Sequence, residues 1–136
     1  MGDKRMKYLD MLQSVISRMA GNQLTLRTWS VGLGTAVIGF AAAKDGHPTA
    51  ALLALLPAAV FWILDAYYLA LEREFRDLFN TARKVNDDDP DFSFNIPGSA
   101  SNWIKALAAP AVWLVHLPVI ALALGIGLCA LSHASS

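Results

Sequence analysis

The fold is decided at residues 61–76, which read Phe-Trp-Ile-Leu-Asp-Ala-Tyr-Tyr-Leu-Ala-Leu-Glu-Arg-Glu-Phe-Arg. The preceding run, residues 50–64, is apolar apart from the helix breaker Pro57, whereas charged residues crowd the chain from Glu72 onward. Asp65 lies at the boundary between the two. An ionised carboxylate at a bilayer centre costs at least about 2.5 kcal/mol. Asp65 must therefore face protein, face water, or lie at the level of the lipid headgroups.

The composition favours a membrane protein. Of 136 residues, 55% are hydrophobic and 16% are charged, against about 25% charged in soluble domains. The apolar residues form three long runs, which indicates an all-α integral membrane protein with three transmembrane helices, all in one domain covering residues 1–136. Because the net charge is zero, no basic footprint for direct nucleic-acid binding is expected.

The N-terminal segment, residues 1–25, is predicted to be an amphipathic helix. Its apolar residues Leu9, Leu12 and Ile16 recur at steps of three and four. Residues 21–22, Gly-Asn, offer a possible stop and restart. The helix either lies on the membrane surface or continues into the first span, and the sequence leaves both open. No cleavable targeting signal is predicted, so we expect the spans themselves to act as the insertion signal.

The first span is predicted at residues 26–43, and it has a face of small residues. Gly32, Ala36, Gly39 and Ala43 follow one another at steps of four, three and four. Such faces let membrane helices approach closely, so this one is a candidate for helix packing or homo-oligomer formation. The alternative is the ordinary glycine and alanine content of a membrane helix.

A five-residue connection, residues 44–48, joins the first span to a second at residues 49–71. Its Asp-Gly pair and the proline that follows are turn and helix-start signals, so the two spans form an antiparallel hairpin. Ala58 and Asp65, seven residues apart, share one face of the second span. Asp65 is therefore expected to point toward packed helices.

Arg27 and Asp65 are predicted to lie at one level. Each is nineteen residues from Gly46 at the hairpin tip, or about 28 Å by helical rise. That level is the inner edge of a hydrocarbon core about 30 Å thick. We expect a structural ion pair between the two spans, while a water-filled entrance lined by Asp65 and a contact with another subunit remain alternatives.

The second span is predicted to leave the membrane without ending and to continue as a cytosolic helix to about residue 84. An apolar stripe continues along it at helical spacing, and it matches the stripe of the N-terminal helix in antiparallel layers. The stripe consists of Tyr68, Leu71, Phe75, Leu78 and Phe79. We expect a two-helix cytosolic stalk, or a layer beneath the membrane.

An acidic linker is predicted at residues 85–102. Aspartates alternate at residues 87–91 with the spacing of a calcium loop, but Phe92 and Gly98 stand where the turn glycine and the bidentate glutamate belong. No metal site is predicted. The segment 92–96 alternates apolar and polar residues; a structureless loop is favoured over a strand or docking peptide.

The third span is predicted at residues 103–131, bent by Pro110 and Pro118. His116 lies about 15 Å inside its apolar stretch. A histidine at mid-depth is a candidate for a pore-lining or other polar intramembrane role. The alternative is a neutral imidazole bonded to a neighbouring helix or to a carbonyl freed by a proline. Cys129, the single cysteine, lies in the same run and is expected to be a small buried hydrophobe.

No catalytic constellation, phosphate loop or cofactor motif is predicted. Asp65 and His116 are placed at different depths by the same arithmetic, so an enzyme that uses both is not expected.

Basic residues near the span ends predict the orientation. Ten of the eleven lie in the chain up to the first residues of the first span, or between the second span and the first residues of the third, while the hairpin tip has only Lys44 and the tail has none. The N-terminus and residues 66–105 are therefore expected in the cytoplasm, and the tip and residues 132–136 in the periplasm or outside.

Residues 61–76 and the upstream Arg-Met-Ala-Gly-Asn at 18–22 resemble a group of small bacterial multi-pass membrane proteins. Some of these are similar to membrane effectors of antiphage systems, such as the membrane subunit of Hailong-type defence, which is partnered with a nucleotidyltransferase. The resemblance covers roughly residues 6–80. It implies membrane disruption or ion conduction at the bacterial inner membrane during phage infection.

Three spans cannot enclose an aqueous pore, so conduction requires a homo-oligomer. The alternative function is a membrane anchor or scaffold whose cytosolic helices dock a soluble partner, such as a nucleotidyltransferase. An aromatic surface exposed on the stalk would favour the anchor, and a symmetric ring would favour the channel.

Overall fold

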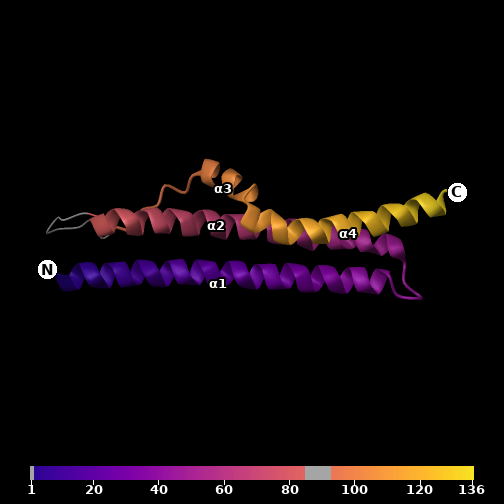
Figure 1. The fold of residues 1–136 in the computed structure, drawn as a ribbon, viewed down its shortest axis with the longest axis horizontal. Helices are drawn as coiled ribbons and strands as arrows, with labels where there is room; N and C mark the ends of the chain where they lie inside the picture. The colour runs from indigo at the N-terminus through magenta and orange to yellow at the C-terminus, as the bar shows by residue number, and fades with distance from the viewer. Residues whose placement is uncertain (1, 85–92) are drawn as a thin grey trace.

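The computed structural model describes residues 2–84 and 93–136, and these contain helices and no strand. The elements in chain order are α1 (Gly2–Ala41), the 3₁₀ helix η1 (Pro48–Ala54), α2 (Leu55–Lys84), α3 (Ala100–Leu107) and α4 (Pro110–Ala134). The molecule is elongated, with α1, α2 and α4 lying lengthwise and α3 against the outside of α2 (Figure 1). The N-terminus lies at one end and the C-terminus at the other.

The N-terminal segment and the predicted first span form one uninterrupted helix. α1 has 40 residues, or about 60 Å by helical rise, which is roughly twice the thickness of a hydrocarbon core. Gly21 does not break it. Of the two arrangements that the sequence leaves open, the structure has the one in which the amphipathic helix continues into the span.

The hairpin turn depends on a glycine. Gly46 N donates to Ala43 O at 2.9 Å, and a Cβ placed on Gly46 would lie 2.4 Å from Phe40 O. Only glycine fits so close to backbone. Pro48 then begins η1 and not an α-helix, and the small buried residues Ala51 and Ala54 let η1 pack closely against α1 and α4.

The third apolar run, predicted to be one helix bent at Pro110 and Pro118, is instead broken at residues 108–109 into α3 and α4. Pro110 is the cause: it lacks an N–H and disfavours the helical conformation of the residue before it, yet it suits the first position of a new helix. Ala109 is accordingly extended. Pro118 lies inside α4. The linker is also shorter than predicted, because residues 100–102 belong to α3, which begins at Ala100.

A small apolar core joins α2 to α3 and the start of α4. Its buried members are Ala66, Leu69, Ala70, Ala106, Ala109 and Val112. Trp62 Nε1 donates to Leu107 O at 3.1 Å, which fixes the end of α3 on α2. Because most of these side chains are alanine, the helices approach closely around them.

The halves of α1 and α2 that are predicted to be cytosolic pack against each other, as the two stripes predict. Leu12 and Ile16 are buried. At the far end, Arg5 donates to the carbonyl of Arg83 near the end of α2, where the last carbonyls lack helical partners. Tyr8 is buried and donates to Ser93 O at 2.8 Å. The described part of the linker therefore folds back onto α1 as a loop without regular structure.

Two helical segments, Pro48–Lys84 and Pro110–Ala134, are long and apolar enough to cross a membrane. The predicted first span, of which residues 26–41 lie in α1, is not among them. Large apolar side chains are nevertheless exposed on it, including Val31, Leu33 and Phe40.

Candidate functional site

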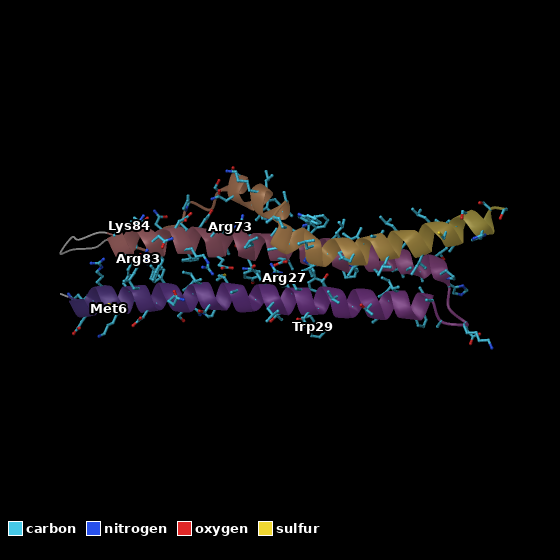
Figure 2. The ribbon with its side chains drawn as sticks, viewed as in Figure 1. Met6, Arg27, Trp29, Arg73, Arg83 and Lys84 are labelled. Atoms are coloured by element: carbon cyan, nitrogen blue, oxygen red, sulfur yellow. The ribbon has the colours of Figure 1, made fainter. Side chains whose placement is uncertain are left out.

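The candidate site is built around Asp65, which is fully buried on α2. Ala58, seven residues earlier, is buried on the same face. Arg27 Nε on α1 donates to Asp65 Oδ2 at 2.8 Å, and the Arg27 side chain keeps 24% of its surface exposed. Figure 2 shows Arg27 directed from α1 toward α2, while Trp29 points outward. The two residues that the hairpin arithmetic places at one level thus form an ion pair.

His116 is the third member of the site. Its Nε2 lies 3.3 Å from Asp65 Oδ2, and its Nδ1 lies 2.8 Å from Ser30 Oγ on α1. A neutral imidazole with its proton on Nε2 satisfies both contacts, because Nε2 then donates to the carboxylate and Nδ1 accepts from the hydroxyl. The Trp62 ring stacks on the imidazole at 6.5 Å between centroids and 9° between planes.

This contact overturns the prediction that Asp65 and His116 lie at different depths. The prediction measured His116 from Ala106, where the apolar stretch of an unbroken third span begins. In the structure, His116 is six residues into α4, or about 9 Å along it, and α3 lies to the side. The interpretation of His116 as an imidazole bonded to neighbouring helices therefore describes its geometry.

A second ion pair continues the network toward the N-terminal end of α1. Arg27 Nη2 donates to Gln23 Oε1 at 3.2 Å, and Gln23 Nε2 donates to Glu72 on α2. Arg76 Nε donates to Glu72 Oε1 at 2.7 Å. The Gln23 amide is oriented by the two charges that it bridges, with its oxygen toward the cation and its amino group toward the anion.

The network balances its charges inside the bundle. Arg27 offsets Asp65, Arg76 offsets Glu72, and the remaining three members, Gln23, His116 and Ser30, are uncharged in the assigned tautomer. One atom is unsatisfied: Asp65 Oδ1 is buried without a hydrogen-bond partner among the described residues. An unmet acceptor of this kind costs about 1 to 3 kcal/mol.

The structure also brings a serine, a histidine and an aspartate together, which the sequence did not predict. Ser30, His116 and Asp65 are linked in that order. All three are buried, with Ser30 exposed by 1%. A substrate could contact the Ser30 hydroxyl only if the helices separated, so the array joins three helices and does not present a nucleophile. Ser30 was missed because single serines in spans have no distinguishing sequence signal.

The predicted small-residue face lies on the outside of the chain. Gly32, Ala36, Gly39 and Ala43 are all exposed, and a Cβ on Gly32 or Gly39 would meet nothing within 4 Å. Packing within the chain uses another glycine: a Cβ on Gly34 would lie 2.4 Å from Val119 Cγ1 of α4.

Two further predictions concern single features. Cys129 is exposed and not buried. No group of three potential metal ligands occurs among the described residues, and the aspartates at residues 87–91 lie outside them.

Comparison of the chain with protein-family models, curated proteins and solved structures finds no match.

Proposed function

We propose that this chain is a three-span protein of the bacterial inner membrane that works as a homo-oligomeric effector in antiphage defence, by forming a channel or pore or by otherwise disrupting the bilayer. The antiphage context rests on the sequence resemblance at residues 61–76 and 18–22. In this proposal the N-terminus is cytoplasmic and the C-terminus periplasmic or extracellular.

The observation that supports the proposal best is the buried network of Arg27, Asp65, His116 and Ser30 inside helices whose exteriors are apolar. Ionisable side chains within spans are costly and are kept mostly for function. Here they are concentrated at one level, and a buried acceptor is left unmet. That pattern suits a site that rearranges.

Oligomer formation is the second requirement, and the exposed face of Gly32, Ala36, Gly39 and Ala43 supports it. The four residues are exposed, a Cβ on Gly32 or Gly39 would meet nothing within 4 Å, and backbones can approach closely along such a face. A second copy could therefore pack there without displacing α2 or α4.

The anchor function has less support. The aromatic stripe of α2 that could present a docking surface is partly buried, and the apolar residues Leu12 and Ile16 of α1 are buried in the stalk. A soluble partner such as a nucleotidyltransferase would have to recognise the polar exterior of the stalk.

The proposal is tested by purifying the protein in detergent, measuring its mass, and measuring ion flux after reconstitution into liposomes. Gly32→Leu and Gly39→Leu should lower both oligomer and flux without preventing insertion. Gly21→Leu is the matched control, because Gly21 is an exposed glycine of the same helix with open space around it. A monomeric wild type without flux in any lipid would contradict the proposal.

A further inference from the structure

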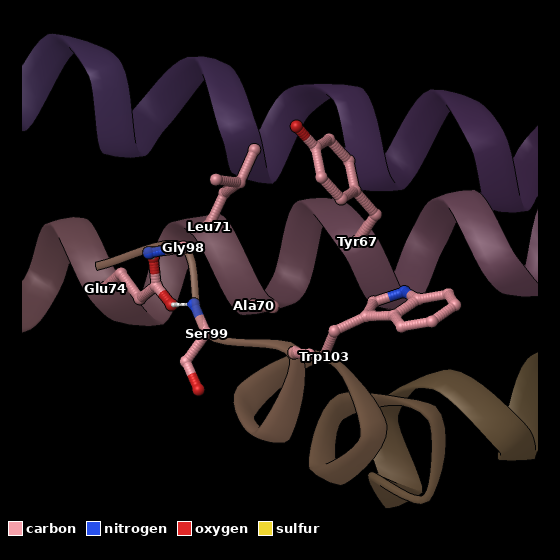
Figure 3. A pocket seen from close by; sticks show the side chains of 8 residues that line it. Tyr67, Ala70, Leu71, Glu74, Gly98, Ser99 and Trp103 are labelled. Atoms are coloured by element: carbon pink, nitrogen blue, oxygen red, sulfur yellow. Dashed lines mark hydrogen bonds between the residues drawn. The ribbon is translucent and has the colours of Figure 1, made fainter. Parts of the chain in front are cut away.

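A cavity of about 350 Å³ lies between α2 and the start of α3, apart from the buried network. Tyr67, Leu71 and Trp103 line it together with the carboxylate of Glu74, and Figure 3 shows Glu74 at one end and the aromatic rings toward the other. Its size is within the range of small-molecule sites, about 300 to 1,000 Å³. We infer that it binds the ethanolamine headgroup of a phospholipid of the inner leaflet.

The acidic end of the cavity is a built site. Glu74 is a carboxylate only 7% exposed, which receives Gly98 N at 3.2 Å and Ser99 N at 3.1 Å. Asn102 Nδ2 also donates to it, at 3.1 Å. These bonds hold the carboxylate in place.

The carboxylate retains capacity for another donor. Its Oε1 receives two of the three bonds, and its Oε2 receives only Gly98 N. A carboxylate oxygen can accept two hydrogen bonds, so Oε2 has one acceptor position left. A buried negative charge with a free acceptor position suits a cationic donor such as a primary ammonium.

The opposite end of the cavity has the chemistry of the membrane interface. Tyr67 is 50% exposed and Trp103 is partly exposed, with its indole nitrogen 3.5 Å from Ile63 O. Tyrosine and tryptophan favour the level of the headgroups, where an apolar ring with a polar edge is best accommodated. The glycerol part of a lipid would lie here.

The position of the cavity in the proposed membrane favours a lipid as the ligand. From Tyr67 to Glu74 it follows α2 for about 10 Å, beginning two residues beyond Asp65 on the cytosolic side. Its polarity rises from the aromatic end to the acidic end, as it does from the glycerol to the amine of a phospholipid. The first-turn N–H of Ala100, which also lines the cavity, is available for the phosphate.

This inference rests on the proposed membrane location, but it does not depend on conduction or oligomer formation. The test measures binding of short-chain phosphatidylethanolamine and phosphatidylglycerol to the delipidated full-length protein in detergent, by native mass spectrometry. Membrane insertion is measured separately by alkaline carbonate extraction, so that failure of the membrane proposal and failure of the headgroup site give different results.

Wild type should prefer phosphatidylethanolamine, and Glu74→Gln should weaken that binding about tenfold, as expected for the loss of a charge-assisted bond, and abolish the preference. Tyr67→Ala leaves the bonds of Glu74 intact, so it should weaken both lipids while the preference persists. Asp77→Asn is the matched control, an exposed acid one turn farther along α2, and should bind as wild type.

Three outcomes would overturn the inference. They are equal binding of the two lipids by wild type, a preference that survives Glu74→Gln in a variant that melts as wild type, and displacement of the lipid by equimolar glycerophosphoethanolamine. The last result would assign the cavity to a soluble amine and not to a lipid.

Discussion

Asp65 and His116, on α2 and α4, meet in the interior with 3.3 Å between Oδ2 and Nε2. Fifty-one residues separate them in the chain. Each has another polar partner on α1, Arg27 for Asp65 and Ser30 for His116. Helices α1, α2 and α4 therefore share one polar site. The contact between Asp65 and His116 fastens α4 to the hairpin of α1 and α2.

The first prediction concerns the Arg27 and Asp65 pair. Asp65→Ala and Arg27→Ala should each lower thermal stability in detergent. The loss should be smaller than the about 3 to 5 kcal/mol of a fully buried pair, because Arg27 is partly exposed.

The charge swap, Asp65→Arg with Arg27→Asp, should recover part of the loss since the sites couple. His116 permits this, because the other tautomer can accept at Nε2 and donate from Nδ1 to Ser30. If Asp65→Asn keeps stability and assembly but abolishes flux, then Asp65 belongs to a conduction path and the structural pairing argument is wrong.

The second prediction isolates the hydrogen bonds of His116. His116→Phe keeps an aromatic ring beside Trp62 but leaves the Ser30 hydroxyl without this acceptor and removes one donor to Asp65. We expect a loss of about 1 to 3 kcal/mol, the cost of unmet buried polar groups, read from thermal unfolding. His133→Phe, at an exposed histidine of the same helix, should change stability little. Equal melting temperatures for the two variants would contradict the buried network.

The third prediction concerns the glycine that brings α1 against α4. Gly34→Ala should destabilise by about 1 to 3 kcal/mol through overpacking, since the added methyl would lie 2.4 Å from Val119 Cγ1. Gly34→Ala combined with Val119→Ala should recover part of this. Gly32→Ala should be tolerated, because nothing lies within 4 Å of its Cβ position. If Gly32→Ala is the more harmful variant in monomeric preparations, the packing of α1 is assigned to the wrong face.

The fourth prediction concerns topology. Ten basic residues in the two proposed cytoplasmic segments place the N-terminus inside and the C-terminus outside. Alkaline phosphatase fused after Ser136 should be active, and a green fluorescent protein fused there should be dark. A fluorescent fusion at Ser136 with inactive phosphatase would refute the orientation.

The helical hairpin could be read from the sequence because its determinants are local. The turn at residues 44–48 is short, so the two helices that it joins must be antiparallel, and helical rise then fixes which residues share a level. Arg27 and Asp65 follow from this count alone. The stalk follows from two apolar stripes in matching layers, of which Leu12 and Ile16 are buried.

The placement of His116 could not be predicted in the same way. Its depth depends on where α4 begins, and the sequence offered an unbroken apolar run in which Pro110 could bend a helix or start one. Both are compatible with local propensity. The structure begins α4 at Pro110 and sets α3 aside on α2 through the apolar core and the Trp62 bond to Leu107.

The sequence by itself determined the helical class, the hairpin and the level that Asp65 shares with Arg27. Periodicity, a short turn and a fixed rise per residue are set by residues close together in the chain. Only the tertiary structure decided that His116 and Ser30 complete the site, that Gly34 and not Gly32 packs within the chain, and that Glu74 holds the start of α3. These contacts join residues far apart in the chain, and they depend on which helix faces meet and where a helix ends. Helical periodicity alone specifies neither which faces meet nor where a helix ends.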